Sequence, residues 1–335
     1  MIQGLKELCS NYLRKVKQTG DSYIMACCPF HDEEHPSFAI NLDLGFFLCH
    51  ACQERGGLRK LLKQLGISDL HIEKEFQFFI DAAEKAWQTA LPKDPRINQI
   101  GKQEPLPEAL LGFFNYCPVD LEEAGFTEKT LKHFEVGVDE YHRRITFPLR
   151  DMYGHLVGIS GRAVDKNVYS RYKVYDDEYV HFGLPKRNTI KKEILWHSHE
   201  VFPALHLSKT KKDLIITEGY KACMWVWQLG FQNVVAISGS SLSEEHAYVI
   251  ERLGVRTFLL LDNNKAGRKG TDIAAQLLAK SSTDIFLPNY DLVCPDKEQP
   301  DQLTQLELQS LLTTATPYYL WRTQHVRTYS YPRKS

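Results

Sequence analysis

The 335-residue sequence predicts a chain of the α+β and α/β classes, with a small N-terminal domain and a parallel sheet closer to the C-terminus. Two observations lead to this expectation. The N-terminal region contains two short pairs of cysteine and histidine residues, separated by a hairpin-like apolar pattern. From Asp213 onward, short apolar strands alternate with helical segments, which is typical of a parallel α/β sheet.

Two pairs of potential metal ligands stand in the N-terminal region: Cys28 with His31, and Cys49 with Cys52. Residues 36–40 and 46–48 are apolar or aromatic and flank a polar turn, so we expect a hairpin that brings the second pair opposite the first. Such pairs supply the four ligands of a tetrahedral zinc site. The alternative is that these are ordinary buried cysteines, but the paired spacing favours zinc.

Three further residues near these pairs, Cys27, His35 and His50, are left out of the predicted ligand set. Cys27 would lengthen the first pair, and His50 lies inside a turn whose end residues normally face the metal. Four protein ligands leave no open coordination position, so the site is expected to be structural. Folding of this region should therefore depend on zinc, since so small a core is weak alone.

Composition sets limits on the kind of protein. The sequence is 43% apolar and 25% charged, as in a globular protein, and no apolar run approaches the roughly 20 residues of a membrane span. The N-terminus lacks the apolar stretch of a signal peptide. We therefore expect a cytoplasmic protein without a membrane partner, whose eight cysteines are reduced.

The formal net charge of -1 gives no overall signal for nucleic acid, so any basic surface must be local. One region fits this requirement. Residues 141–192 contain 11 lysines and arginines against 5 acidic residues. This segment is a candidate surface for phosphate groups.

Helical periodicity predicts a first helix over residues 1–18, a closing helix over 58–65 and a longer one over about 69–91. Residues 92–107 are rich in proline, glycine and polar residues, which is typical of a tether. We predict the following domains: a zinc ribbon over 1–66, a helix and tether over 67–107, an intermediate region over 108–210, a parallel α/β domain over 211–305 and a tail over 306–335.

After a helix-rich stretch at 108–134, residues 144–149 and 156–160 are expected to form two strands joined by a turn. The pattern then changes to strands alternating with helices. The predicted strands are 214–217, 233–237, 256–261 and 285–287, and the predicted helices are 220–229, 244–252 and 269–280.

Two acidic residues follow strands of this predicted sheet. Glu218 follows the first strand and Asp262 the third. Because ligands collect at the carboxyl ends of parallel strands, these carboxylates are candidates for binding Mg²⁺. A lone acid there is often only a helix N-cap. The pair, with the small residues 238–241 after the second strand, favours a metal.

Together these motifs resemble the bacterial DnaG-type DNA primases. The resemblance rests on residues 28–31, 36–38 and 49–52 for the zinc-binding domain, on 144–148, 154, 157–158 and 161–162 for the start of the polymerase domain, and on 218–220, 238–240, 242–246 and 262–267 for the Toprim fold. It covers residues 4 to 305. The expected architecture is thus a zinc ribbon followed by a primase-like polymerase domain with a Toprim sheet.

The resemblance implies synthesis of short RNA primers on single-stranded DNA, with nucleoside triphosphates as substrates. Glu218 and Asp262 would be catalytic and, with Asp301, would bind Mg²⁺ or Mn²⁺. The residues expected to contact nucleotide or DNA are Arg144, Arg162, Arg171, Lys191 and Lys265. The chain contains no Walker A motif and no helicase-binding domain, so a helicase or another replication protein would act in trans, as in short phage or mobile-element forms.

Three acids of the family pattern are replaced here, by Ala222, Asn264 and Gln299. The remaining acids suit one Mg²⁺ better than two. A second hypothesis is therefore a catalytically impaired, primase-derived factor that binds single-stranded DNA or recruits a partner. A third, weaker hypothesis is a Toprim nuclease, which shares the acids but not normally the zinc ribbon.

Overall fold

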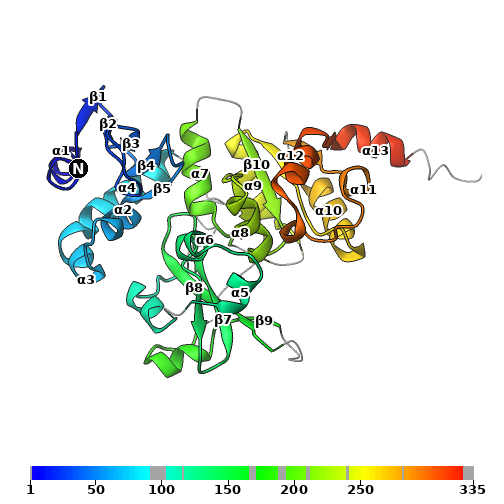
Figure 1. The fold of residues 1–335 in the computed structure, drawn as a ribbon, viewed down its shortest axis with the longest axis horizontal. Coiled ribbons are helices and arrows are strands. Elements are labelled where there is room, and N and C mark those ends of the chain that lie inside the picture. Colours follow the sequence, from blue (N-terminus) through cyan, green and yellow to red (C-terminus); the bar gives the residue numbers. More distant parts are fainter. Residues whose placement is uncertain are drawn as a thin grey trace, which may run out of the picture.

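The structure is a computed structural model that describes residues 2–90, 103–114, 117–165, 171–187, 194–208, 212–238, 241–280 and 283–326. These residues form two five-stranded sheets and one four-stranded sheet. Figure 1 shows the three sheets and the helices around them. Within the same residues, no helix combines the length and apolar character that crossing a bilayer requires.

The N-terminal sheet is antiparallel and runs in chain order. Its strands are β1 (Lys17–Thr19), β2 (Tyr23–Ala26), β3 (Phe38–Asn41), β4 (Phe46–Cys49) and β5 (Arg55–Gly57). The helices packed on it are α1 (Ile2–Tyr12), α2 (Leu58–Gln64), α3 (Asp69–His71), the π-helix η1 (Ile72–Phe76) and α4 (Gln77–Ala90). The predicted hairpin between the two ligand pairs is confirmed as β3 and β4, with Ile40 paired to Phe47.

The first helix is shorter than the sequence predicts. It ends at Tyr12, Lys15 has a positive φ of 53°, and Lys17–Thr19 forms strand β1 on the edge of the sheet. The prediction of one helix over 1–18 was wrong at its C-terminal end. All three β1 residues are exposed, so apolar periodicity carried no signal of this strand.

The middle of the chain begins with η3 (Glu108–Phe114), α5 (Val119–Glu123) and α6 (Glu128–His133). An antiparallel sheet follows, in chain order: β6 (Gly137–Asp139), β7 (Arg144–Arg150), β8 (Leu156–Ala163) and β9 (Tyr172–Val174). After η4 (Glu178–Phe182), helix α7 (Ser198–Leu207) leads to the C-terminal sheet. The strands predicted at 144–149 and 156–160 are confirmed as β7 and β8.

The C-terminal sheet has the order β11-β10-β12-β13-β14. Its strands are β10 (Asp213–Thr217), β11 (Val234–Ala236), β12 (Arg256–Leu259), β13 (Asp284–Leu287) and β14 (Thr316–Pro317). The first four are mutually parallel, whereas β14 is antiparallel to β13. The helices are α8 (Tyr220–Gln228), α9 (Glu244–Leu253), α10 (Lys265–Leu278), α11 (Tyr290–Val293), η6 (Pro300–Gln302), α12 (Gln305–Thr313) and α13 (Tyr318–Val326). The sheet is therefore mixed but mostly parallel.

Successive side chains along each strand point to opposite faces of this sheet. Both faces are apolar, as expected for a sheet covered by helices on both sides. Leu214 and Ile216 of β10 belong to one core, with residues of α7, α9 and α10, while Ile215 belongs to the other, with α8 and α12. A third core joins the N-terminal sheet to α1, α2 and α4.

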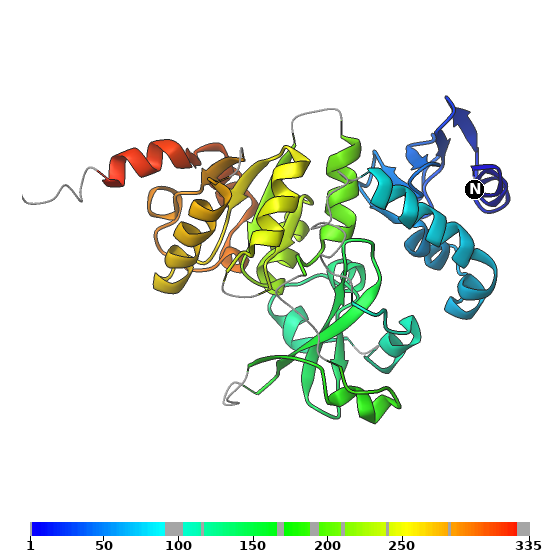
Figure 2. The same ribbon diagram turned by 180° about the vertical axis from the view of Figure 1, so that it is seen from behind.

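Helix α7 lies between the N-terminal and C-terminal sheets, and Figures 1 and 2 show this arrangement from opposite sides. The antiparallel sheet β6 to β9 lies next to α6, outside the line that joins the other two sheets. Helices α1 and α13 lie at opposite ends of the long axis of the molecule.

Candidate functional site: a zinc centre and a carboxylate pair

The four predicted zinc ligands come together. Cys28, His31, Cys49 and Cys52 place one ligand atom each within 4.8 Å of one another. The Sγ atoms of Cys28 and Cys52 are 3.9 Å apart, as are Cys49 Sγ and His31 Nδ1. Ligands of tetrahedral zinc are separated by roughly 3.5 to 3.8 Å, so the set fits zinc. Three thiolates and one imidazole are also the ligand chemistry of a structural zinc site.

Neighbouring groups hold these ligands in place. His31 Nε2 lies 3.2 Å from Glu33 Oε2, which leaves Nδ1 for the metal. Glu33 Oε1 accepts the backbone N–H of Cys28 at 2.7 Å and that of Ser37 at 3.2 Å, and the Ser37 hydroxyl lies 3.2 Å from Cys49 Sγ. The Cys52 N–H also points to Cys49 Sγ, at 3.4 Å. These contacts orient the ligands before metal arrives.

None of the three excluded residues joins this group. Cys27 is buried next to Cys28 but is not among the four clustered residues, and His35 and His50 are exposed. The His50 N–H donates to Ser37 O at 2.8 Å, so the turn from Cys49 to Cys52 presents its end residues to the metal. The exclusion made from the spacing therefore agrees with the geometry.

Glu218 and Asp262 lie at the carboxyl ends of adjacent parallel strands. Glu218 directly follows β10, and Asp262 follows β12, its neighbour in the sheet. Both side chains are partly buried. Burial and the charge of Asp262 raise the pKa of Glu218, and burial, Asp301 and Glu298 raise the pKa of Asp262 against an opposing hydrogen bond from Gln299. A carboxylate whose pKa is raised by neighbouring negative charge would be stabilised in its charged form by a cation.

The third predicted metal ligand, Asp301, is in η6 and forms an ion pair. Its Oδ2 lies 2.9 Å from Lys221 Nζ, in the first turn of α8. Gln299, which replaces an expected acid, donates from Nε2 to Asp262 Oδ2 at 3.3 Å. Among the described residues, Glu218, Asp262 and Asp301 do not form a three-ligand group within 4.8 Å. The site thus carries less net negative charge than three carboxylates would give.

Asn264 uses its side-chain oxygen inside the protein. Its Oδ1 accepts the N–H groups of Ala266 and Gly267, both at 3.0 Å, and so caps α10. The helix begins at Lys265 and not at 269 as predicted, because this cap starts it earlier. A Cβ at Gly267 would lie 2.1 Å from the backbone oxygen of Asp262, so only glycine allows this close approach.

The predicted nucleotide and DNA contacts are only partly described. Lys191 lies outside the described residues, as do residues 239–240 of the small-residue turn that was predicted beside the metal pair. Arg171 and Lys265 are exposed, Arg162 is partly buried, and Arg144 donates from Nη1 to Gly161 O at 3.1 Å.

Tyr172 links the basic segment to the acidic residues. Burial raises the pKa of Tyr172; the charges of Arg162 and Arg171 lower it and that of Asp301 raises it. The Tyr172 ring lies 6.2 Å from that of Tyr220, at the start of α8, so β9 approaches this end of the helix.

Other cations of the basic segment are paired. Arg150 donates to Glu108 from both Nη1 and Nη2, at 2.8 and 2.9 Å, and to Glu135 at 2.6 Å. Burial alone would raise the pKa of Glu108, but the Arg150 charge lowers it to about 2. Arg150 is therefore a structural residue and not part of a basic surface.

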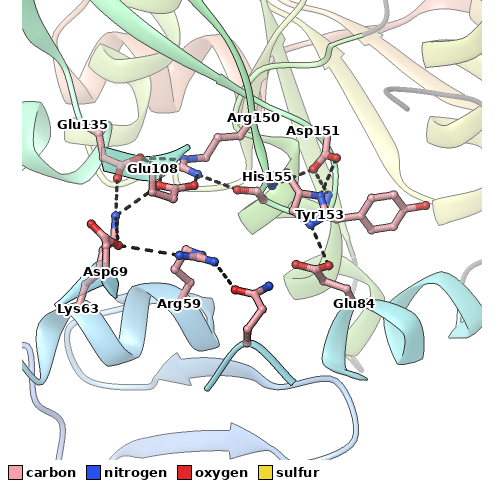
Figure 3. Close-up of polar contacts among 12 residues, drawn as sticks. Arg59, Lys63, Asp69, Glu84, Glu108, Glu135, Arg150, Asp151, Tyr153 and His155 are labelled. Atoms are coloured by element: carbon pink, nitrogen blue, oxygen red, sulfur yellow. Dashed lines mark hydrogen bonds and ion pairs between the residues drawn. The ribbon is translucent and has the colours of Figure 1, made fainter. Parts of the chain in front are cut away.

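Figure 3 shows that the Glu108–Arg150 pair forms part of the contact between the N-terminal region and the middle sheet. From α2, Lys63 approaches Glu108 at 3.4 Å, and from α4, Glu84 pairs with His155 at 2.9 Å. Nearby, a cavity of about 690 Å³ is lined by residues of both regions, and neither Glu218 nor Asp262 lines it. The cavity and the carboxylate pair are separate features.

Sequence reasoning missed Lys221 and Tyr172. Lys221 stands one position before Ala222, within the motif that supplied Glu218, so its place near the acids could have been noticed. Tyr172 follows Arg171 directly, and its ring lies 6.2 Å from that of Tyr220 in α8. No local pattern indicated that β9 lies against the start of α8.

Two known domain families match this chain. Residues 3–89 match the CHC2 zinc finger, and residues 215–302 match the Toprim-like family. The DNA primase of Chlamydia pneumoniae is 27% identical over 321 residues, which cover 81% of this chain and 52% of that protein. The DNA primase of Lactococcus lactis is 25% identical over 361 residues, covering 90% and 51%. The chain thus spans about half the length of these relatives.

Solved structures share the fold. The Aquifex aeolicus primase, zinc-binding and RNA polymerase domains, aligns with a TM-score of 0.61 at 19% identity, covering 98% of this chain and 88% of that one. A DnaG primase catalytic domain bound to single-stranded DNA aligns with a TM-score of 0.50 at 18% identity, covering 68% and 82%. At these identities the likeness concerns the fold alone.

The two matched families define a protein in which a CHC2 zinc finger precedes a Toprim sheet. The two families follow each other along the chain in the same order as the primase motifs of the sequence. The alignment with the Aquifex aeolicus primase structure covers 98% of this chain. The chain therefore contains a CHC2 zinc finger and a Toprim-like domain, and it is similar in sequence to DNA primases and shares the primase fold.

Proposed function

We propose that this chain synthesises short RNA primers on single-stranded DNA by metal-dependent nucleotidyl transfer. The observation that carries the proposal is the position of Glu218 and Asp262 at the carboxyl ends of the adjacent parallel strands β10 and β12. Carboxylates at this edge bind Mg²⁺ or Mn²⁺ and leave coordination positions for phosphate oxygens. The DNA primases of Chlamydia pneumoniae and Lactococcus lactis support this assignment.

When bound, the cation would supply charge neutralisation for the triphosphate and activation of the primer 3′ oxygen. Glu218 and Asp262 would hold it at the sheet edge. Asp301 would contribute only after its ion pair with Lys221 opens. Since the three replaced acids leave few carboxylates, we assign one cation to the protein itself, with any second one held mainly by nucleotide phosphates.

Arg162, Arg171 and Tyr172 would bind template and nucleotide near this edge. Arginine side chains pair with phosphate oxygens, and an aromatic ring stacks on an unpaired base. The single-stranded DNA in the related DnaG catalytic domain supports a template of this kind. Lys265 and Arg144 are further phosphate contacts of the proposal, as is Lys191.

The zinc-binding region would help to select the start site, as the family resemblance implies. Strand separation would be the task of a helicase or another replication protein acting in trans, in the cytoplasm.

One set of contacts favours a second function, a primase-derived factor that binds single-stranded DNA without catalysis. Asn264 is engaged as a helix cap, Asp301 is paired with Lys221, and Ala222 provides no ligand. These features lower the capacity of the edge for metal while leaving the basic residues in place. Both hypotheses assume the same fold. They differ in whether Glu218 and Asp262 bind a catalytic metal ion.

A primer-synthesis assay on single-stranded DNA with labelled ribonucleotides and Mg²⁺ or Mn²⁺ decides between them. We expect product from the wild type and a loss of about 100-fold or more with Glu218→Gln or Asp262→Asn, since metal stabilisation of the transition state amounts to several kcal/mol. Glu244→Gln, an exposed acid at the start of α9, is the matched control and should keep activity.

DNA binding is measured on the same proteins. If zinc-loaded wild type binds single-stranded DNA but yields no product on any template, the catalytic proposal is wrong and the binding factor is correct. Salt-dependent binding that weakens in Arg162→Ala and Arg171→Ala would locate the DNA on the proposed surface under either hypothesis.

A further inference from the structure

A second group of metal-ligand side chains lies where the zinc-binding region meets the rest of the chain. It consists of His133, at the end of α6, His197, which precedes α7, and Glu200, in the first turn of α7. We call these three residues the His–Glu cluster. Their side chains are only 4%, 2% and 5% exposed, respectively. Neither the zinc ribbon nor the carboxylate pair includes any of them.

The three ligand atoms form a nearly equilateral triangle. His133 Nε2 and His197 Nε2 are 3.4 Å apart. Glu200 Oε2 is 3.4 Å from the first nitrogen and 3.5 Å from the second. Ligands of tetrahedral zinc at bond lengths of about 2.05 Å are separated by roughly 3.3 Å. The triangle therefore has the dimensions of three zinc ligands around one ion.

Hydrogen bonds on the far side of each ring fix the tautomers. His197 Nδ1 lies 2.8 Å from Val234 O, which can only accept, so Nδ1 carries the proton and Nε2 a lone pair. Lys60 Nζ has three protons and three closest acceptors: Glu200 Oε1 at 2.7 Å, Glu54 Oε1 at 2.9 Å and Arg55 O at 2.9 Å. His133 Nδ1 lies 3.2 Å from both Lys60 Nζ and Glu54 Oε1. Because the three Lys60 protons face closer acceptors, Nδ1 is assigned as the donor to Glu54, which leaves a lone pair on its Nε2.

With these tautomers, two imidazole lone pairs and one carboxylate oxygen face one another without a proton between them. Glu200 Oε2 is buried and accepts no hydrogen bond from the described residues. Burial lowers the pKa of His133 to about 4. Burial would raise the pKa of Glu200, but the charge of Lys60 keeps it well below its usual range. The two lone pairs and the carboxylate oxygen are thus directed toward one another as metal ligands would be.

We propose that His133, His197 and Glu200 bind a divalent transition-metal ion, zinc by preference, at a second site distinct from the zinc ribbon. Two imidazoles and one carboxylate suit zinc and its first-row neighbours better than Mg²⁺ or Ca²⁺, which prefer oxygen ligands. Val234 O and Glu54 occupy the outer positions where a carbonyl or carboxylate normally orients a metal-binding histidine.

The outer shell of this site comes partly from the zinc-binding region. Glu54 and Lys60 precede and follow strand β5, whereas all three ligands belong to the remainder of the chain. Lys60 binds Glu200 through Oε1 and leaves Oε2 facing the histidines. The 690 Å³ cavity borders the cluster and has room for a water molecule as fourth ligand. Metal affinity and docking of the zinc-binding region are thus coupled.

The test is the metal content of the full chain. After dialysis against metal-free buffer and reloading with zinc, mass spectrometry of the metals should find two zinc ions per wild-type chain. His197→Gln should retain one, and Glu54→Gln should weaken the second site by about 10 to 100-fold. Glu84→Gln, at the same contact between regions but outside the cluster, is the matched control and should keep two.

Cobalt(II) distinguishes the two sites even if a variant is poorly folded. The first equivalent should give the sulfur-to-cobalt charge-transfer band of the thiolate site, and a second equivalent should add d–d absorption without that band. Wild type that takes up only one equivalent of zinc or cobalt would overturn the proposal, as would a His197→Gln variant that still takes up two. These readouts do not depend on primer synthesis.

Discussion

Lys221 Nζ lies 2.9 Å from Asp301 Oδ2, so one of the carboxylates expected to bind metal forms an ion pair with a lysine instead. Lys221 belongs to the first turn of α8, next to Ala222, which replaces one of the family's acids. The pairing lowers the net negative charge beside Glu218 and Asp262. The Lys221 ammonium would therefore compete with the divalent cation that we propose for this edge of the sheet.

Replacing this lysine should strengthen cation binding. In Lys221→Gln, Asp301 loses its partner and adds its charge to the site, so we expect Mg²⁺ or Mn²⁺ affinity to rise by about tenfold, or 1.4 kcal/mol. Isothermal titration calorimetry of both proteins measures this. Asp301→Asn in the Lys221→Gln background should cancel the gain. An unchanged affinity in Lys221→Gln would show that the ion pair does not limit metal binding.

Asn264 should matter for stability more than for metal binding. Asn264→Ala removes the acceptor for two N–H groups at the start of α10 and should cost about 1 kcal/mol of unfolding free energy. Asn264→Asp keeps the cap and should cost little. Chemical denaturation gives these values, and Mg²⁺ affinity should not change in Asn264→Ala. A large loss of Mg²⁺ affinity with unchanged stability would instead make Asn264 a metal ligand.

Loss of zinc should unfold the N-terminal region selectively. Cys49→Ser removes one of four ligands, and apparent zinc-binding energies of roughly 10–16 kcal/mol exceed what a small core provides. Hydrogen exchange should then show loss of protection across residues 2–90 while the C-terminal sheet stays protected. Cys27→Ala, next to the ligand set but outside it, should keep zinc and protection. Equal protection in Cys49→Ser and wild type would contradict the structural role.

Docking of the zinc-binding region should weaken at alkaline pH through His155. Burial alone would lower the pKa of His155, but hydrogen bonds to Asp151 and Glu84 raise it to about 10 from 6.5. A raised pKa in the folded state means that the contribution is complete below about pH 6.5 and is lost as pH rises toward 10. Above pH 10 the pair with Glu84 on α4 has lost its charge.

The comparison of wild type with His155→Gln isolates this group. The stability difference between the two proteins, from denaturation at a series of pH values, should be largest near pH 6.5 and should shrink toward pH 10. Hydrogen exchange in α4 should follow the same trend. A difference that stays constant over this interval would show that the pKa of His155 is not raised in the folded protein.

Local patterns were enough to predict much of this structure. The spacing of Cys28, His31, Cys49 and Cys52 predicted a site that the fold assembles, and apolar runs predicted β10 and β12 within about two residues. A missed signal was Asn264, whose position before α10 is that of an N-cap. These features depend on contacts between residues close in sequence.

The remaining features depend on contacts between distant segments. Arg150 appeared to be part of a basic surface because its sequence neighbours are basic, yet its partner Glu108 comes from η3. The pairing of Lys60 with Glu200 likewise joins two regions 140 residues apart. No periodicity or motif encodes such pairs, so the His–Glu cluster was not predicted from the sequence.

The proposed function requires that Glu218 and Asp262 bind a divalent cation. The most direct measurement is anomalous scattering from crystals of the zinc-loaded protein soaked with Mn²⁺ and a nucleoside triphosphate. Our account predicts a manganese peak between the two carboxylates that disappears in Asp262→Asn. Absence of the peak in the wild type, with nucleotide bound, would contradict it.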